Sequence, residues 1–290
     1  MSRTPAARNT PGDGTFLPGP VLVGILNVTP DSFSDGGEFL DPEPAANHAA
    51  AMLDEGAGII DVGGESTRPG SDPVAQDEEI RRVIPVIERL LAVRPEAVIS
   101  IDTYRAETAA AALGAGASVV NDVTALRGDP RMASFVAEAG CPVVLMHMKG
   151  EPKTMQEEPF YDDVVREVRD FLAQRAEYAV AAGVRPENII VDPGIGFGKS
   201  LEHNLALLRD LDAIVDLGFP VIVGASRKRF IGTITGVEVA SERVFGTVAT
   251  TVLAYQKGAR YFRVHDVRAN RDALAVAEAV LRRSEGSRRR

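Results

Sequence analysis

The stretch VLVGILNVTPDSFSDGG, residues 21–37, joins an apolar run to a polar one within a few positions. Val21 to Leu26 has the length and the branched side chains of a buried strand. From Asn27 onward the residues turn polar, and Pro30 together with the closing glycine pair prevents a helix from starting there. The sequence therefore predicts a buried strand that ends at Asn27, followed by a mobile polar loop, Asp31–Gly37.

The same apolar pattern recurs along the chain, and stretches with helical periodicity separate the runs. The eight strand candidates are Val21–Leu26, Gly58–Val62, Ala97–Ile101, Ser118–Val120, Val143–Met146, Ile189–Val191, Val221–Val223 and Tyr261–Val264. Helical stretches between them include Asp77–Leu91, Arg105–Leu113, Asp162–Ala182, Leu201–Val215 and Ser241–Lys257. Apolar strands that alternate with helices are typical of a parallel sheet covered by helices. Eight such units predict a single-domain (β/α)8 TIM barrel over residues 19–283, with a doubly wound open sheet as the alternative.

Composition and charge limit the partners of this barrel. Hydrophobic residues make up 45% of the 290 residues, and the formal net charge is −9. An acidic chain is a poor partner for nucleic acid or an anionic membrane, and no run of 18 apolar residues predicts a membrane span. The single cysteine, Cys141, excludes an internal disulfide and indicates a reducing compartment, the cytoplasm. Residues 1–18 are predicted to form a disordered lead-in, and residues 284–290 a frayed tail.

Polar residues stand at or just past the end of every apolar run. They are Asn27, Asp61, Asp102, Asn121, His147, Asp192, Ser226 and His265. In a barrel the carboxyl ends of the strands converge on one face, where active sites of this fold are built. We therefore expect the chemistry at this face. The glycine-rich loop at 194–200 is not a phosphate-binding P-loop, because the position five residues before Gly198 is Pro193.

Nine segments, in order, resemble the dihydropteroate synthase family, the folate-pathway enzymes targeted by sulfonamides. They are Gly24–Gly37, Asp61–Gly70, Ser100–Thr103, Val120–Val123, Leu145–Met148, Pro152–Glu157, Asp192–Lys199, Ser226–Lys228 and Arg263–Asp266. The likeness extends from about Val21 to Glu278. It implies a transferase that joins (7,8-dihydropterin-6-yl)methyl diphosphate to 4-aminobenzoate, releasing diphosphate. It also implies a homodimer.

The resemblance assigns roles to particular residues. It implies that Asp102, Asn121, Asp192 and Lys228 hold the pterin, whose amino-pyrimidine edge needs a carboxylate and facing donors. Met146 and Phe197 are expected to form apolar walls beside the ring. The resemblance also implies that Arg263 and His265 bind the diphosphate, and their side chains point to the same side of their strand. Asn27 is expected to complete a Mg²⁺ site, and Thr67 and Arg68 to lie on a second closing loop.

Other interpretations remain open for several of these residues. Asp102 and Asp192 could each be helix caps after a strand, and Met146 and Phe197 could be core residues. Arg229 follows the Ser226–Lys228 segment and could contact the aminobenzoate carboxylate or be solvated. At the level of function, the alternatives are a methyltetrahydrofolate–corrinoid methyltransferase and a catalytically inactive pterin-binding paralogue. The first would not need a diphosphate site.

Overall fold

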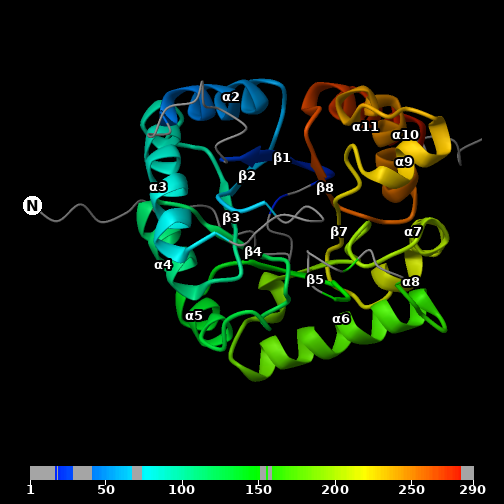
Figure 1. Cartoon of the computed structure of the whole chain (residues 1–290), viewed down its shortest axis with the longest axis horizontal. Helices are drawn as coiled ribbons and strands as arrows, with labels where there is room; N and C mark the ends of the chain where they lie inside the picture. The colour runs from blue at the N-terminus through cyan, green and yellow to red at the C-terminus, as the bar shows by residue number, and fades with distance from the viewer. Residues whose placement is uncertain are drawn as a thin grey trace, which may run out of the picture.

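The computed structural model describes residue 17 and residues 19–28, 41–66, 74–150, 155 and 159–281. In these ranges eight parallel strands form one sheet, and helices follow one another around its outside (Figure 1). The strands are β1 (Val21–Asn27), β2 (Ile59–Gly63), β3 (Ile99–Asp102), β4 (Val119–Asp122), β5 (Val143–Met146), β6 (Ile189–Asp192), β7 (Ile222–Val223) and β8 (Tyr261–Val264). The helices are α2 (Pro42–Asp54), α3 (Gln76–Val93), α4 (Ala106–Ala115), α5 (Met132–Ala139), α6 (Val164–Ala181), α7 (Leu201–Arg209), α8 (Asp212–Val215), α9 (Arg229–Thr235), α10 (Val244–Gln256) and α11 (Val267–Leu281), with short 3-10 helices η1 (Pro186–Asn188) and η2 (Ala240–Glu242).

The sheet closes on itself, but unevenly. Its strand order is β6-β5-β4-β3-β2-β1-β8-β7, every pair being parallel. The strands at the two ends of this order, β6 and β7, meet through one isolated bridge between Val191 and Val221. There the Val191 amide donates to the Pro220 carbonyl at 2.9 Å. This closure confirms the predicted (β/α)8 barrel and excludes the open doubly wound sheet.

Side-chain alternation along the strands separates two apolar regions. On β1, Val21 and Val23 belong to a cluster inside the barrel, together with Ile59, Ile190 and others. Leu22 and Leu26, which point the other way, belong to the larger cluster between the sheet and the helices. Both faces of each strand are therefore buried, which explains why the strands read as continuous apolar runs rather than alternating ones.

Most helix positions agree with the predictions, and two differ. The predicted helix Ser241–Lys257 starts within η2, and α10 itself begins at Val244. The predicted helix Leu201–Val215 is in fact two helices, α7 and α8, which meet at Asp210. The backbone of Asp210 leaves the helical region, and its carbonyl accepts from the Ala213 amide to start a new turn. Aspartate competes poorly for helix interiors because its short carboxylate favours caps and turns. The helical periodicity of this stretch continued through the break, so the sequence pattern did not reveal it.

None of the described helices is long and apolar enough to cross a membrane. The predicted lead-in, residues 1–18, lies outside the described residues except for Leu17, which packs against the cluster inside the barrel. The predicted tail, residues 284–290, also lies outside them. Cys141 is buried, as expected for a structural thiol, and burial raises its pKa to about 11.

Candidate active site at the carboxyl ends of the strands

The side chains that point into the barrel change from apolar to polar along the strands. Ile59, Val144, Ile190 and Tyr261 form part of the inner apolar cluster. The residue two positions further along a strand points the same way. This rule places Asp61 after Ile59, Met146 after Val144, Asp192 after Ile190 and Arg263 after Tyr261. The carboxyl-terminal end of the barrel is therefore the polar end, as predicted.

Arg263 joins two carboxylates at this end. Its Nε donates to Asp61 Oδ2 at 2.6 Å, and its Nη2 donates to Asp102 Oδ2 at 2.8 Å. Asn121 donates to the same Asp61 oxygen at 3.0 Å. Asp61 and Asp102 are both buried, so these charges interact with little screening by water. One guanidinium thus ties β2, β3 and β8 together, and Asn121 adds β4.

The protonation of Asp102 is shifted by this arrangement. Burial raises the pKa of Asp102 to about 7, against the attraction of Arg263 and with further help from the nearby Asp61 carboxylate. The two carboxylates share one arginine, so its positive charge balances only one of them, and ionisation of the second carboxylate is disfavoured. Near neutral pH, Asp102 can therefore both donate and accept a proton.

A pH dependence of stability follows from Asp102. An unfolded aspartate has a pKa of roughly 4, so between about pH 4 and 7 the unfolded chain binds fewer protons than the folded one at this site. Stability from this group therefore falls as the pH rises through that window and is constant above it. We expect wild type to lose stability relative to Asp102→Asn between pH 4.5 and 7, as measured by urea unfolding. A difference that stays flat across this range would contradict the shift, and Asp216→Asn, an exposed site, is the control.

Asp192 and Lys228 form the second charged group of the site. Asp192 is buried and accepts the Gly194 amide at 2.7 Å through Oδ1. Burial raises the pKa of Asp192, and the Lys228 charge opposes this rise. Burial also lowers the pKa of Lys228 to about 7, although Asp192 attracts its proton. The Lys228 ammonium donates to the Ile195 carbonyl and lies 4.3 Å from the centre of the Phe197 ring.

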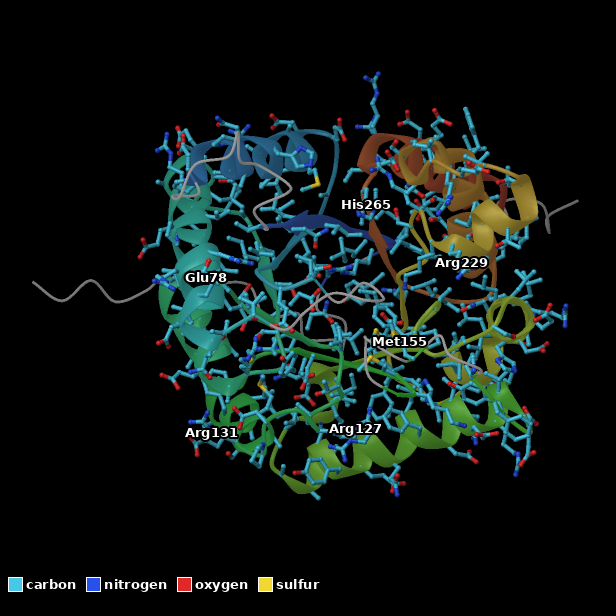
Figure 2. All side chains as sticks on the ribbon, viewed as in Figure 1. Glu78, Arg127, Arg131, Met155, Arg229 and His265 are labelled. Atoms are coloured by element: carbon cyan, nitrogen blue, oxygen red, sulfur yellow. The ribbon has the colours of Figure 1, made fainter. Side chains whose placement is uncertain are left out.

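An apolar wall lies beside these charges. Met146 belongs to a small buried cluster with Val123, Met148 and Met155, and Phe197 and Tyr104 pack against it. Met146 and Phe197 thus lie in the same cluster. Figure 2 shows Met155 near the middle of the ring of helices, whereas Glu78 lies on the ring itself. Flexible thioethers and an aromatic face suit a flat heterocycle.

The glycine-rich loop after β6 is held by a buried lysine that the sequence analysis missed. Lys199 Nζ lies 2.9 Å from His147 Nδ1 and donates to the Phe197 carbonyl at 2.9 Å. Burial lowers the pKa of Lys199 well below its usual value, and burial together with the Lys199 charge lowers the pKa of His147 to about 2. His147 is therefore neutral, and its ring contacts the lysine that holds this loop.

Close backbone approach makes Gly194 indispensable in the same loop. Its φ is +65°, and a Cβ added there would lie 1.9 Å from the His147 carbonyl oxygen. Gly218 also has a positive φ, +84°, but a Cβ there would meet nothing within 4 Å. Gly218→Ala should therefore cost only backbone strain, about 1–2 kcal/mol. Gly194→Ala should cost about 1–3 kcal/mol more, because the loop must move away from β5. Urea midpoints of the two variants test this, and equal midpoints would refute the steric argument.

One of the expected residues, Lys228, is not at a strand end, whereas His265 is. Lys228 lies five residues beyond the end of β7, as the residue that caps α9. His265 follows β8 directly, and its Nδ1 lies 3.0 Å from Ser226 Oγ, which also accepts the His265 amide at 3.1 Å. The turn after β7 and the end of β8 are thereby linked. Arg229 is exposed at the start of α9 and makes no ion pair with the described residues.

The expected metal ligand and loop residues are only partly described. Asn27 is the last residue of β1 and is half-buried. A Cβ placed on Gly63 would lie 3.9 Å from Asn27 Oδ1 and 3.7 Å from Asp102 Oδ2, so both oxygens border Gly63. Within the described ranges, no group of three or more His, Cys, Asp or Glu side chains could hold a metal ion. Thr67, Arg68 and the segment Asp31–Gly37 lie outside the described residues.

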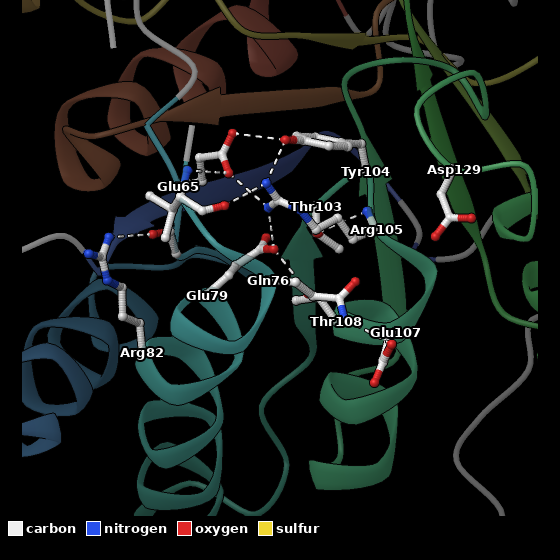
Figure 3. Close-up of polar contacts among 12 residues, drawn as sticks. Glu65, Gln76, Glu79, Arg82, Thr103, Tyr104, Arg105, Glu107, Thr108 and Asp129 are labelled. Carbon is white, nitrogen blue, oxygen red and sulfur yellow. Dashed lines mark hydrogen bonds and ion pairs between the residues drawn. The ribbon is translucent and has the colours of Figure 1, made fainter. Parts of the chain in front are cut away.

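A further polar network, beside β3, explains Tyr104, for which the sequence offered no interpretation. The Tyr104 hydroxyl contacts Glu65 at 3.2 Å and accepts from Arg105 at 2.6 Å (Figure 3). Arg105 also pairs with Glu65 at 2.8 Å and with the buried Glu79 at 2.6 Å. Glu65 in turn accepts the Val74 amide at 3.1 Å. The network fixes the residues just after Asp102, the predicted pterin ligand.

Comparison with known proteins agrees with this geometry. Residues 23–265 match the family described as pterin binding enzyme. A dihydropteroate synthase of Synechocystis sp. is 48% identical over 261 residues, 90% of each chain. The Xanthomonas albilineans dihydropteroate synthase with 4-aminobenzoic acid has a TM-score of 0.86 and 49% identity, over 91% of this chain and 94% of that one. Its complex with 7,8-dihydropteroate gives 0.83 and 47%, over 91% and 95%. The chain therefore belongs to the pterin-binding enzyme family. Its matched relatives place it among the dihydropteroate synthases of that family.

Proposed function

We propose that this chain condenses (7,8-dihydropterin-6-yl)methyl diphosphate with 4-aminobenzoate, giving 7,8-dihydropteroate and diphosphate. The observation that carries the proposal is the set Asp102, Asn121, Asp192 and Lys228 at one end of the barrel, in a chain whose relatives are dihydropteroate synthases. The structurally similar X. albilineans enzyme has been solved with 4-aminobenzoic acid and with 7,8-dihydropteroate.

The pterin would be recognised by groups of opposite kind. The Asp192 carboxylate accepts two parallel N–H bonds from the amino-pyrimidine edge, one on each oxygen, and Oδ1 keeps a second lone pair for the Gly194 amide. Asn121 and Lys228 donate to the ring oxygen and nitrogen. Asp102 can serve in either protonation state. Phe197 and Met146 cover the ring faces, and the buried carboxylates would disfavour heterocycles that lack matching donors.

The diphosphate would be bound beside the pterin. Arg263 uses Nε and Nη2 for Asp61 and Asp102, and its Nη1 makes no hydrogen bond to the described residues. That third nitrogen and His265 are our candidates for the phosphate oxygens. Thr67 and Arg68 are further candidates, from the family resemblance. A planar guanidinium held by two carboxylates keeps a fixed orientation toward such an anion.

A magnesium ion fits the donor set only together with substrate. Asn27 provides one neutral oxygen at the end of β1, and the described residues offer no dedicated cage of carboxylates. Mg²⁺ commonly keeps several waters and binds one or two protein oxygens plus substrate phosphates. Asn27 would therefore provide one ligand, and the oxygens of the bound diphosphate and waters would provide the others. Bound there, the ion would neutralise charge that develops on the departing diphosphate.

In the reaction, the carbon–oxygen bond between the pterin methylene and diphosphate breaks first, and its electron pair leaves with diphosphate. The amine nitrogen of 4-aminobenzoate then forms a bond to the methylene carbon and loses a proton to water. Arg263 and His265 stabilise the charge on the leaving group. The pterin ring, held by Asp192 and Asn121, delocalises the positive charge left on the methylene. A strong general base is unnecessary, because the carbon is made electrophilic.

Assembly and location are further parts of the proposal. The late helices carry exposed apolar side chains, Phe245 and Leu253 on α10 and Val276 and Val280 on α11. A homodimer through α10 and α11 would cover them, because contiguous exposed apolar surface marks interaction sites. Sedimentation equilibrium would test this, and a monomer at all concentrations would rule it out. A cytoplasmic location is supported by the single buried thiol.

The activity is tested by diphosphate release. Purified protein receives the pterin diphosphate and Mg²⁺, with and without 4-aminobenzoate. We expect release that depends on 4-aminobenzoate and yields 7,8-dihydropteroate. Tight pterin binding without release would indicate the inactive paralogue instead. Absence of pterin binding would overturn the site assignments as well.

A further inference from the structure

Arg227 lies between two site residues, Ser226 and Lys228, yet its own side chain points elsewhere. It forms part of the turn that leads from β7 to α9. Its φ is +59°, a conformation that residues other than glycine rarely adopt. Such backbone persists only where the surroundings enforce it, and it concentrates at functional sites. The contacts that enforce it here can be named.

The backbone of Arg227 is fixed from both sides by the region that begins α10. Its amide donates to Thr247 Oγ1 at 3.0 Å. Its carbonyl accepts from Arg243 Nη1 at 3.0 Å. The Thr247 hydroxyl also donates to the Arg243 carbonyl at 3.0 Å, so the two residues that hold the Arg227 backbone are themselves connected. The turn before Lys228 is therefore held rigidly against α10.

The side chain of Arg227 is fixed by the end of β8. Its Nε donates to Asp266 Oδ2 at 2.9 Å and its Nη2 to Asp266 Oδ1 at 2.5 Å. This two-point pair is partly buried, with 28% and 21% of the two side chains exposed. Asp266 directly follows His265, whose ring contacts Ser226. Two neighbouring cross-links, Arg227–Asp266 and Ser226–His265, thus join the same two segments.

We infer that Arg227 is a positioning residue, which with Asp266 holds Lys228 and His265 at a fixed separation and does not itself bind substrate. The arginine stands in a run of cations, Arg227-Lys228-Arg229, that would otherwise suggest a phosphate-binding role. Its fork, however, is already matched to a carboxylate. Arg227 therefore sets the distance between the pterin-binding lysine and the diphosphate-binding histidine. The kinetic consequences rest on the proposed function.

A double-mutant cycle separates positioning from direct binding. The variants are Arg227→Met, Asp266→Asn and the two combined, and Arg169→Met, in an exposed pair on α6, is the matched control. If Arg227 acts through Asp266, each single variant should lower kcat about 10-fold or more, and the double variant should lose no more than the worse single one. Arg227→Lys should fail to restore activity, because an ammonium cannot form the two-point pair. Arg169→Met should behave as wild type.

Other results would overturn the inference. A direct diphosphate ligand would make Arg227→Met raise KM for the pterin diphosphate, while Asp266→Asn left activity within twofold of wild type. Both single variants within twofold of wild type would also exclude a positioning role.

A measurement without turnover keeps the test valid if the proposed function fails. The ¹⁵N shifts of the His265 ring, assigned with His265→Gln, report its contact with Ser226. We expect these shifts to change in Arg227→Met and in Asp266→Asn, but not in Arg169→Met. Unchanged shifts in both of the first two variants would show that the pair does not hold His265.

Discussion

Pterin affinity is expected to fall at least about 100-fold when Asp192 is replaced by asparagine. The substitution preserves the shape of the side chain. The remaining oxygen can still accept the Gly194 amide, which lies 2.7 Å from Asp192 Oδ1 in the wild type. The new amide nitrogen then takes the place of Oδ2 and faces an N–H donor of the pterin edge. Of two charge-assisted hydrogen bonds, each contributing about 1.5–3 kcal/mol, one becomes a contact between two donors and the other loses its charge. Calorimetric titration with 7,8-dihydropteroate measures the effect.

The stability of the same variant provides an internal check. Burial raises the pKa of Asp192, which means that its charged form is disfavoured in the folded protein. A neutral amide avoids that penalty, so the free energy of unfolding should stay equal or rise. Asp216→Asn, an exposed site on the same chain, should change neither affinity nor stability. Affinity retained within about threefold in Asp192→Asn would remove Asp192 from the pterin site.

Replacing Arg263 with methionine is expected to damage both stability and activity. The substitution leaves Asp61 and Asp102 buried without their cation, and Asp61 Oδ1 already has no hydrogen-bond partner among the described residues. Removing one partner from a buried ion pair costs about 3–5 kcal/mol. For a chain of this size the melting temperature should fall by roughly 10 °C. Activity should fall by about 10³-fold, because stabilisation of the departing diphosphate is lost at the same time.

A second substitution separates the two effects of Arg263. In Arg263→Met combined with Asp61→Asn, one of the stranded charges is gone, so part of the stability should return. Activity should not return, since the cation is still missing. Guanidinium unfolding and the diphosphate-release assay measure the two quantities, with Arg169→Met as the control. If Arg263→Met unfolded within about 1 kcal/mol of wild type, the bridge between the two aspartates would not carry the stability assigned to it.

The architecture and the position of the site could be predicted because both depend on local pattern. Apolar runs of strand length and their spacing determine a parallel barrel. The alternation of side chains then determines which residues face inward, as it did for Asp192 after Ile190 and for Arg263 after Tyr261. Left-handed glycines such as Gly116 and Gly183 stand where helices end, with φ of +112° and +101°.

Contacts between distant residues could not be predicted in this way. Asp61 stood at a strand end in the sequence, but nothing local showed that it would share Arg263, 202 positions away, with Asp102. Lys199 reads as a solvated loop lysine, since its burial depends on His147 from another strand. The family resemblance named Lys228 as a site candidate, but the strand pattern did not place it at the cap of α9.

The single bridge between β6 and β7 makes this side of the barrel its most easily opened seam. Local opening requires the least free energy where the fewest hydrogen bonds hold neighbouring segments, so amide exchange should be fastest along this line. Asp192 is the last residue of β6, on one side of this seam, and Lys228 follows β7, on the other side. A pterin that contacts both residues would connect β6 to the turn after β7. It would therefore shift the conformational ensemble of the protein toward the closed barrel. Part of the binding free energy would then be used to close the barrel, and the bound ligand would contribute to the stability of the fold.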